Sequence, residues 1–194
     1  MPLHLVDRAV LRQRIIAVPQ DPVFLPGNSS VRSNLDPFGV STDDACREVL
    51  EAVQLWGFIL NRGGLDAPLS ADILSQGQKQ LFSLAQAVLR RRIREREAKD
   101  ISSGEKGTAS VSGGILLIDE ISSSVDRDTD KHMQDVILRE FNEYTIIMIS
   151  HRLDLVMHFN TVVVMEQGEI VETGTPQDLM QSEGTRFREM WLRS

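Results

Sequence analysis

The sequence is poor in the features that mark secreted, membrane-spanning or nucleic-acid-binding proteins. Cys46 is its single cysteine, which excludes an internal disulfide and suits a reducing compartment. The formal net charge of −7 leaves no excess of basic residues for a nucleic-acid footprint. The longest apolar runs, Ile115–Ile118 and Ile146–Ile149, fall far short of the roughly 18 residues that cross a bilayer, and no signal peptide is visible. We therefore expect one globular domain, 194 residues long and 41% hydrophobic, that is soluble alone and reaches a membrane only through a partner or another segment.

Short apolar runs alternate with helical repeats, and this alternation predicts an α/β fold with a mainly parallel sheet. A strand is expected at Ile15–Val18. The uniformly apolar Ile115–Ile118 is typical of a parallel strand covered on both faces, and Thr145–Ile149 is expected to be a second buried strand. Segments on either side of Gln167-Gly168 predict a hairpin. Helices are expected after Ser41–Asp44, from Ser75, around Met133–Phe141 and from Thr175.

The helix that starts at Ser75 has a head suited to anion binding. Ser75 to Gln78 fits the S-x-x-Q capping box, and the following apolar residues recur at helical spacing. A helix N-terminus offers unpaired N–H groups and a positive dipole end. With the Ser75 hydroxyl and a glycine at 77 that admits an anion closely, it has the parts of a phosphate site. An ordinary helix cap is the alternative, and on these residues alone it is favoured.

Polar residues also follow the predicted strands at their carboxyl ends, where α/β proteins bind ligands. Asp119 is a candidate Mg²⁺ ligand, and Glu120 is a candidate for polarising an attacking water. His151 follows the 145–149 strand and is a candidate for contact with a γ-phosphate. Gln20, held between two prolines, is a candidate for contact with Mg²⁺ or the attacking water. Capping acids, a structural histidine and a solvated loop glutamine are the alternatives.

The order and spacing of these residues resemble the nucleotide-binding domain of ATP-binding cassette (ABC) proteins. Val18–Pro22 resembles the Q-loop, and Leu74–Gln78 resembles the signature motif, with Gln76 where glycine is commonest. Ile115–Glu120 is similar to Walker B followed by the catalytic glutamate. Ser122–Asp126 resembles the D-loop, and Ser150-His151 resembles the switch histidine.

One further segment narrows the resemblance to the multidrug-resistance-associated subfamily, subfamily C. Asn34–Phe38 is similar to the segment after the Q-loop in that group, and Glu120 matches the catalytic glutamate that its second nucleotide-binding domain keeps. The polar stretch at about 97–113 resembles an insertion of fungal members. The resemblance covers nearly all of 10–194. It implies a partial nucleotide-binding domain over 1–194, with a helical signature subdomain at about 40–92 and a flexible insertion at about 97–113.

The phosphate-loop pattern G-x-x-x-x-G-K-[ST], or Walker A, is absent from the sequence, and that loop supplies most triphosphate binding in such domains. The resemblance implies an ABC fold without its N-terminal strands and Walker A. It therefore implies an ATPase in an intact parent and negligible activity for this chain alone. By the same resemblance, the segment around Val23–Val31 lies near the coupling contact with the membrane domain.

The resemblance assigns a role to each candidate residue. Glu120 and His151 are catalytic, and Asp119 and Gln20 hold Mg²⁺. The residues that contact ATP, partly on an opposing domain, are Gln20, Ser75, Gly77, Gln78 and Asp126. The implied partners are a second nucleotide-binding domain and the transmembrane domains of an exporter, and nucleic acid is not among them.

Three functions remain open. The first is energy coupling in an export transporter at the cytoplasmic face of a membrane, with efflux of a small molecule. The second is a truncated, non-catalytic module that only pairs with another ABC domain. The third is a soluble ABC ATPase that acts on DNA or translation, which the Asn34–Phe38 segment and the lack of a basic face disfavour.

Overall fold

The computed structural model describes residues 3–104, 113–120 and 125–193, and the described chain forms two compact units, Met1–Met148 and Ile149–Ser194. The predicted D-loop residues Ser122–Ser124 lie outside the described residues. Within the part of the chain that the structure describes, every helix is too short or too polar to cross a bilayer.

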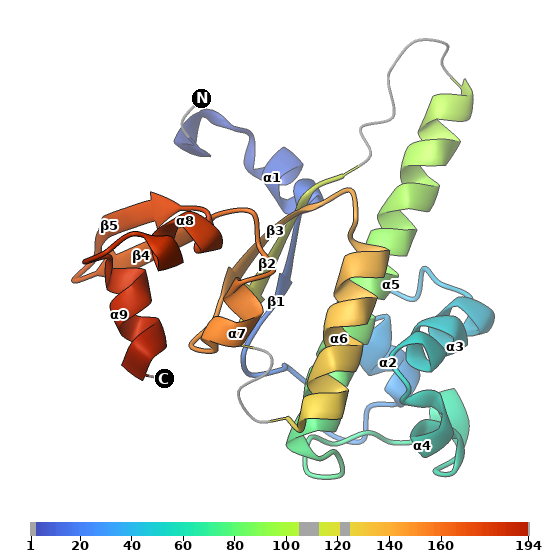
Figure 1. Ribbon diagram of the computed structural model, residues 1–194. Helices are drawn as coiled ribbons and strands as arrows, with labels where there is room; N and C mark the ends of the chain where they lie inside the picture. The colour runs from blue at the N-terminus through green and yellow to red at the C-terminus, as the bar shows by residue number, and fades with distance from the viewer. Residues whose placement is uncertain (1–2, 105–112, 121–124, 194) are drawn as a thin grey trace. The chain divides into compact units, whose positions relative to one another are not determined.

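A three-stranded sheet organises the first unit (Figure 1). Its order is β1 (Ile15–Val18), β2 (Ile115–Asp119) and β3 (Thr145–Ile149), with β3 ending where the second unit begins. Strands β1 and β2 run parallel, with Ile15 opposite Ile115 and Val18 opposite Ile118. Parallel neighbours need a long crossover, and the helices between β1 and β2 provide it. The predicted α/β fold with a parallel sheet is confirmed.

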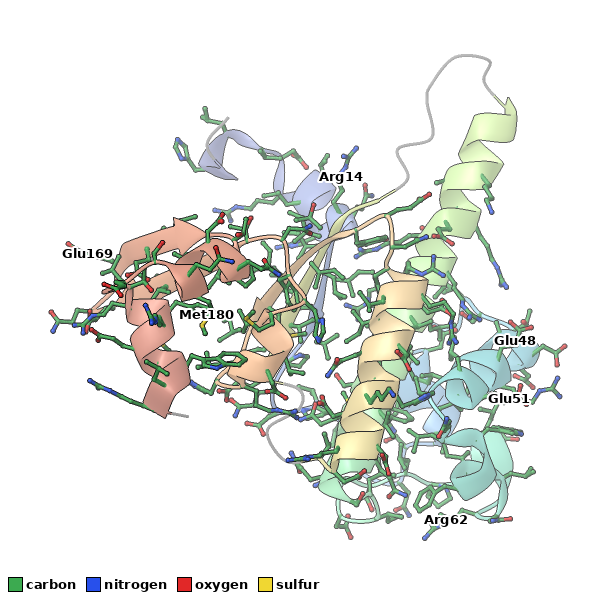
Figure 2. The ribbon with its side chains drawn as sticks, in the orientation of Figure 1. Arg14, Glu48, Glu51, Arg62, Glu169 and Met180 are labelled. Atoms are coloured by element: carbon green, nitrogen blue, oxygen red, sulfur yellow. The ribbon has the colours of Figure 1, made fainter. Side chains whose placement is uncertain are left out.

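Helices supply most of the core of this unit. The sequence begins with a 3₁₀ turn, Leu3–Leu5, and a second such turn covers Gly64–Asp66. The helices of this unit are α1 (Arg8–Arg14), α2 (Val31–Leu35), α3 (Asp43–Ala52), α4 (Trp56–Leu60), α5 (Gln76–Gly104) and α6 (Arg127–Glu140). Thr42 caps α3 through its side chain, and the charged side chains of Glu48 and Glu51 point away from the sheet (Figure 2).

The core of this unit lies on one face of the sheet. Ile16, Val18, Leu116 and Ile118 are almost fully buried in one cluster with apolar residues of α5 and α6. The alternate side chains point to the other face, where Leu117 is 36% exposed and Ile147 is 50% exposed. The predictions of a β2 strand covered on both faces and of a buried strand at 145–149 are therefore wrong for this chain, because α5 and α6 pack on one face only.

Helix α5 is longer than its apolar repeat predicts. The helix starts at Gln76, as expected, and continues to Gly104, so 97–104 is helical. Arginine, glutamate, lysine and alanine are good helix formers, and Arg91 pairs with Glu95 one turn later. The remaining residues of the expected insertion before Gly113, 105–112, lie outside the described residues.

The second unit folds around its own small core. It contains α7 (Leu153–Val156), β4 (Val162–Glu166), β5 (Glu169–Gly174), α8 (Pro176–Gln181) and α9 (Arg186–Arg193). Strands β4 and β5 pair antiparallel, which confirms the predicted hairpin. Positive φ values of 52° at Gln167 and 86° at Gly168 give the turn the twist that matches a two-residue hairpin. Buried residues join these elements: Leu153, Val162, Val164, Leu179 and Phe187.

Candidate functional site

Gln20 and Glu120 meet where β1 and β2 leave the sheet. The Gln20 side-chain Nε2 donates a hydrogen bond of 3.0 Å to Glu120 Oε2. The sheet register explains this contact, because Val18 and Ile118 are paired and each of the two residues lies two positions further along its strand. Parallel strands bring their carboxyl ends to the same edge, so residues 100 apart in sequence become neighbours.

Glu120 has an unusual backbone. Its φ is +46°, a left-handed conformation that non-glycine residues rarely adopt. Such strain persists when the surroundings fix the residue, and it gathers at functional sites. Here β2 holds the residue on one side, while Gln20 holds its carboxylate. The arrangement turns the Glu120 side chain toward the loop after β1.

Asp119 is the last residue of β2 and is exposed. Its carboxylate and the Gln20 amide oxygen are hard oxygen donors of the kind that Mg²⁺ prefers. Among the described residues, no group of three or more His, Cys, Asp or Glu side chains is placed to hold a metal ion. Mg²⁺ in nucleotide sites is held by one or two carboxylates together with water and phosphate oxygens. The donor set of Asp119 and Gln20 fits that kind of site.

The start of α5 is capped as the sequence predicts. The Gln78 backbone N–H donates to Ser75 Oγ at 3.2 Å, and the Ser75 N–H donates to Gln78 Oε1 at 3.0 Å. Ser75 is exposed, so its hydroxyl remains accessible from outside. Gly77 lies close to the start of α6, since a Cβ there would lie 3.3 Å from Val125 Cγ1, just before the helix, and 3.9 Å from Thr129 Cγ2 within it. Gly77 thus allows the two helix starts to pack closely. This structural role is additional to its predicted role in anion binding.

Asp126 caps α6. Its carboxylate accepts hydrogen bonds from the backbone N–H groups of Asp128 and Thr129, at 3.1 and 3.0 Å, and from the Thr129 hydroxyl at 2.7 Å. The Thr129 N–H bond is the largest of the effects that lower the pKa of Asp126 below its ordinary value. Asp126 therefore fixes the start of the helix that packs beside Gly77.

His151 belongs to the second unit and follows β3 after one intervening residue, Ser150. Ser150 shapes the chain there, because its Oγ accepts a 2.9 Å hydrogen bond from the Arg152 N–H. The candidate residues for a magnesium–phosphate site are Gln20, Asp119, Glu120 and His151. The structure brings Gln20 to Glu120, and Asp119 precedes Glu120 in the chain. The place of His151 relative to these three stays a prediction.

Two buried amides make hydrogen bonds that the sequence analysis did not predict. Gln80 is 2% exposed, and its Nε2 donates to the Gln20 carbonyl at 2.6 Å. Asn34 is 1% exposed, and its Oδ1 accepts from the Leu25 N–H at 2.7 Å. The signal for Gln80 was present, since it lies one helical turn before Leu84 on the apolar stripe of α5. A polar residue on such a stripe indicates a specific buried hydrogen bond.

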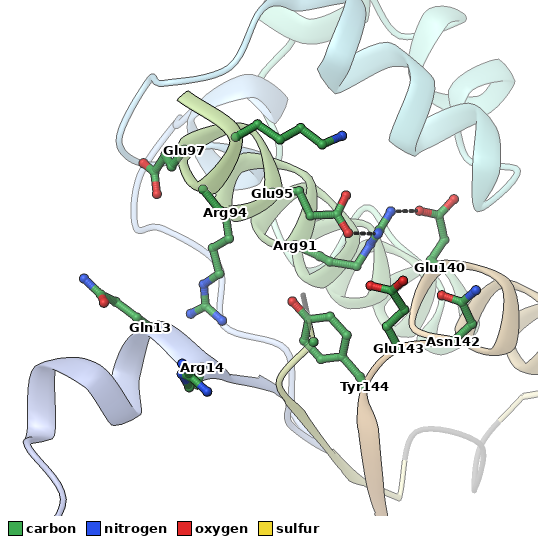
Figure 3. Close-up of a pocket in the computed structure, with 13 residues that line it drawn as sticks. Gln13, Arg14, Arg91, Arg94, Glu95, Glu97, Glu140, Asn142, Glu143 and Tyr144 are labelled. Carbon is green, nitrogen blue, oxygen red and sulfur yellow. Dashed lines mark hydrogen bonds and ion pairs between the residues drawn. The ribbon is translucent and has the colours of Figure 1, made fainter. Parts of the chain in front are cut away.

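A cavity of about 570 Å³ lies at the opposite, amino-terminal end of the strands (Figure 3). Its charges are largely committed to partners within the unit. Arg91 pairs with Glu95 and with Glu140, and Arg94 donates to the carbonyls of Arg12 and Ile15 at 2.7 and 3.1 Å. These contacts join α5 to the end of α6 and to the start of β1, so we assign them to stability.

Sequence comparison relates the chain to much longer proteins. It is 58% identical over 190 residues to the ABC-type transporter braE of Annulohypoxylon truncatum and 51% identical over 192 residues to the ABC transporter FGM5 of Gibberella zeae. These alignments cover 98% of this chain and 12% of each relative. Its homologues are fungal ABC transporters. The chain corresponds to about one eighth of their length, and no protein-family model matches it.

The fold is also that of part of an ABC exporter. A bacterial Atm1-family ABC exporter with ATP bound superposes with a TM-score of 0.78 over 98% of this chain and 30% of the exporter chain. The sequence identity is 24%, so this likeness concerns the fold. The α/β architecture expected from the ABC resemblance is thereby confirmed.

Proposed function

We propose that the chain is part of a nucleotide-binding domain of an ABC export transporter, in which ATP binding and hydrolysis drive efflux of a small molecule. The observation that carries this proposal is the 3.0 Å hydrogen bond between Gln20 and Glu120 at the carboxyl edge of parallel strands. The names of the fungal relatives support the transport role.

The residues at the sheet edge divide the catalytic work. Bound Mg²⁺–ATP supplies the phosphoryl group that is transferred to water. Asp119 and the Gln20 amide oxygen would hold the Mg²⁺, and the Glu120 carboxylate would orient the attacking water and accept its proton. By the ABC resemblance, His151 would contact the γ-phosphate. Because Gln20 donates to Glu120 through Nε2, its amide oxygen is the atom that would hold the metal.

A second nucleotide-binding domain would complete the ATP-binding sites. Ser75, Gly77, Gln78 and Asp126 lie at or beside the start of α5 and serve ATP held by the opposing domain. The exposed Ser75 at a helix of 29 residues supports this role, because the N–H groups and the dipole of a helix N-terminus attract phosphate. The helical signature subdomain at about 40–92 carries this surface.

The Asn34–Phe38 segment and Glu120 favour assignment of the chain to the second nucleotide-binding domain of a subfamily C transporter. The transmembrane domains are the other partner. Val23 is 76% exposed and Leu25 is 40% exposed, so the chain just after the Q-loop presents apolar side chains for such a contact. The domain would then work at the cytoplasmic face of a membrane.

A hybrid transporter tests the proposal. In it, this chain replaces the aligned 190 residues of the transporter braE, and the unmodified transporter is the reference. We expect the hybrid to hydrolyse ATP at a rate within about tenfold of the reference, and Glu120→Gln to lower kcat by about a hundredfold or more. Equal rates for the hybrid and its Glu120→Gln variant would contradict the proposal.

The isolated chain is expected to show negligible ATP binding and hydrolysis, because its sequence has no phosphate-loop pattern. A clear ATPase rate that disappears in Glu120→Gln would overturn this expectation.

The same lack of a phosphate loop favours a second candidate function, a non-catalytic module that pairs with another ABC domain. Mixing the chain with an ATP-loaded partner domain tests it. We expect ATP-dependent association that is lost in Ser75→Arg. If the unsubstituted chain also fails to associate with the ATP-loaded domain, that result would count against the module.

A further inference from the structure

A buried glutamine links the start of α5 to the candidate catalytic residues. Gln80 donates from Nε2 to the Gln20 backbone carbonyl at 2.6 Å, and Gln20 donates from its own Nε2 to Glu120 at 3.0 Å. Two consecutive hydrogen bonds therefore run from α5, through the loop after β1, to the carboxylate at the end of β2.

Packing alone does not explain an amide at this position. Gln80 is 2% exposed, and its Oε1 has no hydrogen-bond partner among the described residues. A buried polar atom without a partner destabilises a fold, and methionine would fill the same volume without that cost. Such exceptions to good packing concentrate at functional sites.

The loop around Gln20 has few ways to be held. Pro19 and Pro22 lack backbone N–H donors, so neither can anchor the loop through a donated hydrogen bond. The Gln20 carbonyl is an acceptor in the middle of this stretch, and the short bond from Gln80 fixes it to a long helix. The backbone that carries the Gln20 side chain is thereby held in place.

We propose that Gln80 is a positioning residue for ATP hydrolysis: it holds the Gln20 main chain so that the Gln20 amide reaches Glu120 and the metal beside it. This inference rests on the proposed function. Gln80 acts through Gln20, and most triphosphate binding in such domains comes from the phosphate loop, whose pattern this sequence lacks. Its loss should therefore lower kcat and leave the KM for ATP nearly unchanged. Displacement of a catalytic group by about 1 Å lowers rates by up to about a hundredfold, so a loss of tenfold or more is expected.

The hybrid transporter allows a matched comparison on one helix. Gln86, also on α5, donates from Nε2 to the Asn34 carbonyl at 2.8 Å. Asn34 belongs to α2 and not to the loop around Gln20. Gln80→Met should lower kcat about tenfold or more with a KM for ATP within about twofold. Gln86→Met, which removes the same kind of bond away from Gln20, should change kcat by less than about twofold. Equal losses in both variants would overturn the proposal.

A double-mutant cycle separates positioning from a general structural role. If Gln80 acts through Gln20, then Gln80→Met should add less than about twofold to the defect of Gln20→Ala. If the two losses multiply, Gln80 does not act through Gln20 and the proposal fails. An unsubstituted hybrid that lacks ATPase activity while the reference is active would instead contradict the proposed function, and the role of Gln80 would fail with it.

Gln80→Glu gives a signature that misfolding cannot imitate. Glutamate has the shape of glutamine, donates a hydrogen bond only when protonated, and is more easily protonated when buried. The kcat of this variant, divided by that of the unsubstituted hybrid, should rise as the pH falls from about 8 to about 6. A ratio that stays flat or decreases would contradict a role for the donated bond.

Discussion

Glu140, at the end of α6, offers a sharp test of how the first unit is held together. It is 7% exposed and lies between two arginines of α5, with Oε2 2.7 Å from Arg91 Nη2 and Oε1 2.9 Å from Arg92 Nη2. Figure 3 shows the bond from Arg91. In Glu140→Gln, the amide keeps one acceptor oxygen, but its NH₂ group faces a guanidinium that can only donate. The variant therefore loses at least one charge-assisted bond and removes the buried counter-charge, so that, among the described residues, Arg91 and Arg92 keep only the more exposed Glu95 and Glu48 as ion-pair partners.

The expected loss follows from these contacts. A hydrogen bond to a charged group contributes about 1.5–3 kcal/mol, and removing one partner of a buried ion pair costs about 3–5 kcal/mol. Since Arg91 and Arg92 keep part of their surface in water, with side chains 15% and 24% exposed, we expect about 3 kcal/mol. The matched control is Glu48→Gln. Glu48 also pairs with Arg92 but is 57% exposed, so its loss should stay below about 1 kcal/mol.

Urea unfolding measures both variants. Trp56 belongs to the first unit, so its fluorescence reports on that unit when Trp191 is replaced by phenylalanine in every protein compared. The reasoning is refuted if Glu140→Gln and Glu48→Gln lower the free energy of unfolding equally, or if Glu140→Gln changes it by less than about 1 kcal/mol.

The pH dependence gives an independent check. Burial raises the pKa of Glu140, but the hydrogen bonds and charges of Arg92 and Arg91 outweigh burial and leave the pKa below its ordinary value. A carboxyl whose pKa falls on folding stabilises the folded state above its unfolded pKa, about 4.3 for glutamate, and this contribution is lost as the pH falls through the lowered value. The stability difference between the parent and Glu140→Gln should therefore be constant from about pH 5 to 8 and shrink below about pH 4.

Three further predictions concern single local features. Ser75→Ala removes the side-chain acceptor at the start of α5 and should lower the free energy of unfolding by about 1 kcal/mol, whereas Ser75→Thr should retain most of it in the same urea assay. Gly168→Ala places a side chain at a φ of 86° and should cost about 1 kcal/mol, while Gln167→Asn, which favours this turn, should stabilise it by a few tenths of a kcal/mol. Cys46 is fully buried and burial raises the pKa of its thiol, so a thiol reagent should label the chain only after denaturant unfolds it.

The meeting of Gln20 and Glu120 could be anticipated from the sequence because two local signals combine. Each residue follows an apolar strand, and a parallel register brings the ends of such strands together. The backbone conformation of Glu120 could not be anticipated, because a φ of +46° is one that glutamate, like other residues with a Cβ, seldom adopts.

The covering of the sheet was mispredicted for a related reason. The apolar composition of β2 indicates that both of its faces avoid water, but composition does not say which segment covers each face. In the first unit, α5 and α6 bury Leu116 and Ile118, while Leu117 remains partly exposed. Helix α5 is longer than its apolar repeat predicts. Its last turns depend on helix propensity and ion pairs, which produce no hydrophobic periodicity from which a helix could be predicted.

The residues at the start of α5 serve structure and proposed function together, and this affects how their variants must be read. Ser75 caps α5, Asp126 caps α6, and Gly77 lets the two helix starts approach, with Val125 3.3 Å from where its Cβ would be. The resemblance gives each of the three a part in binding ATP across an interface. A loss of activity in a variant of any of them is therefore ambiguous by itself. The two roles separate only when stability of the chain and ATP-dependent association with a partner are measured on the same protein, because a cap or a close helix contact changes the first and a phosphate contact changes the second.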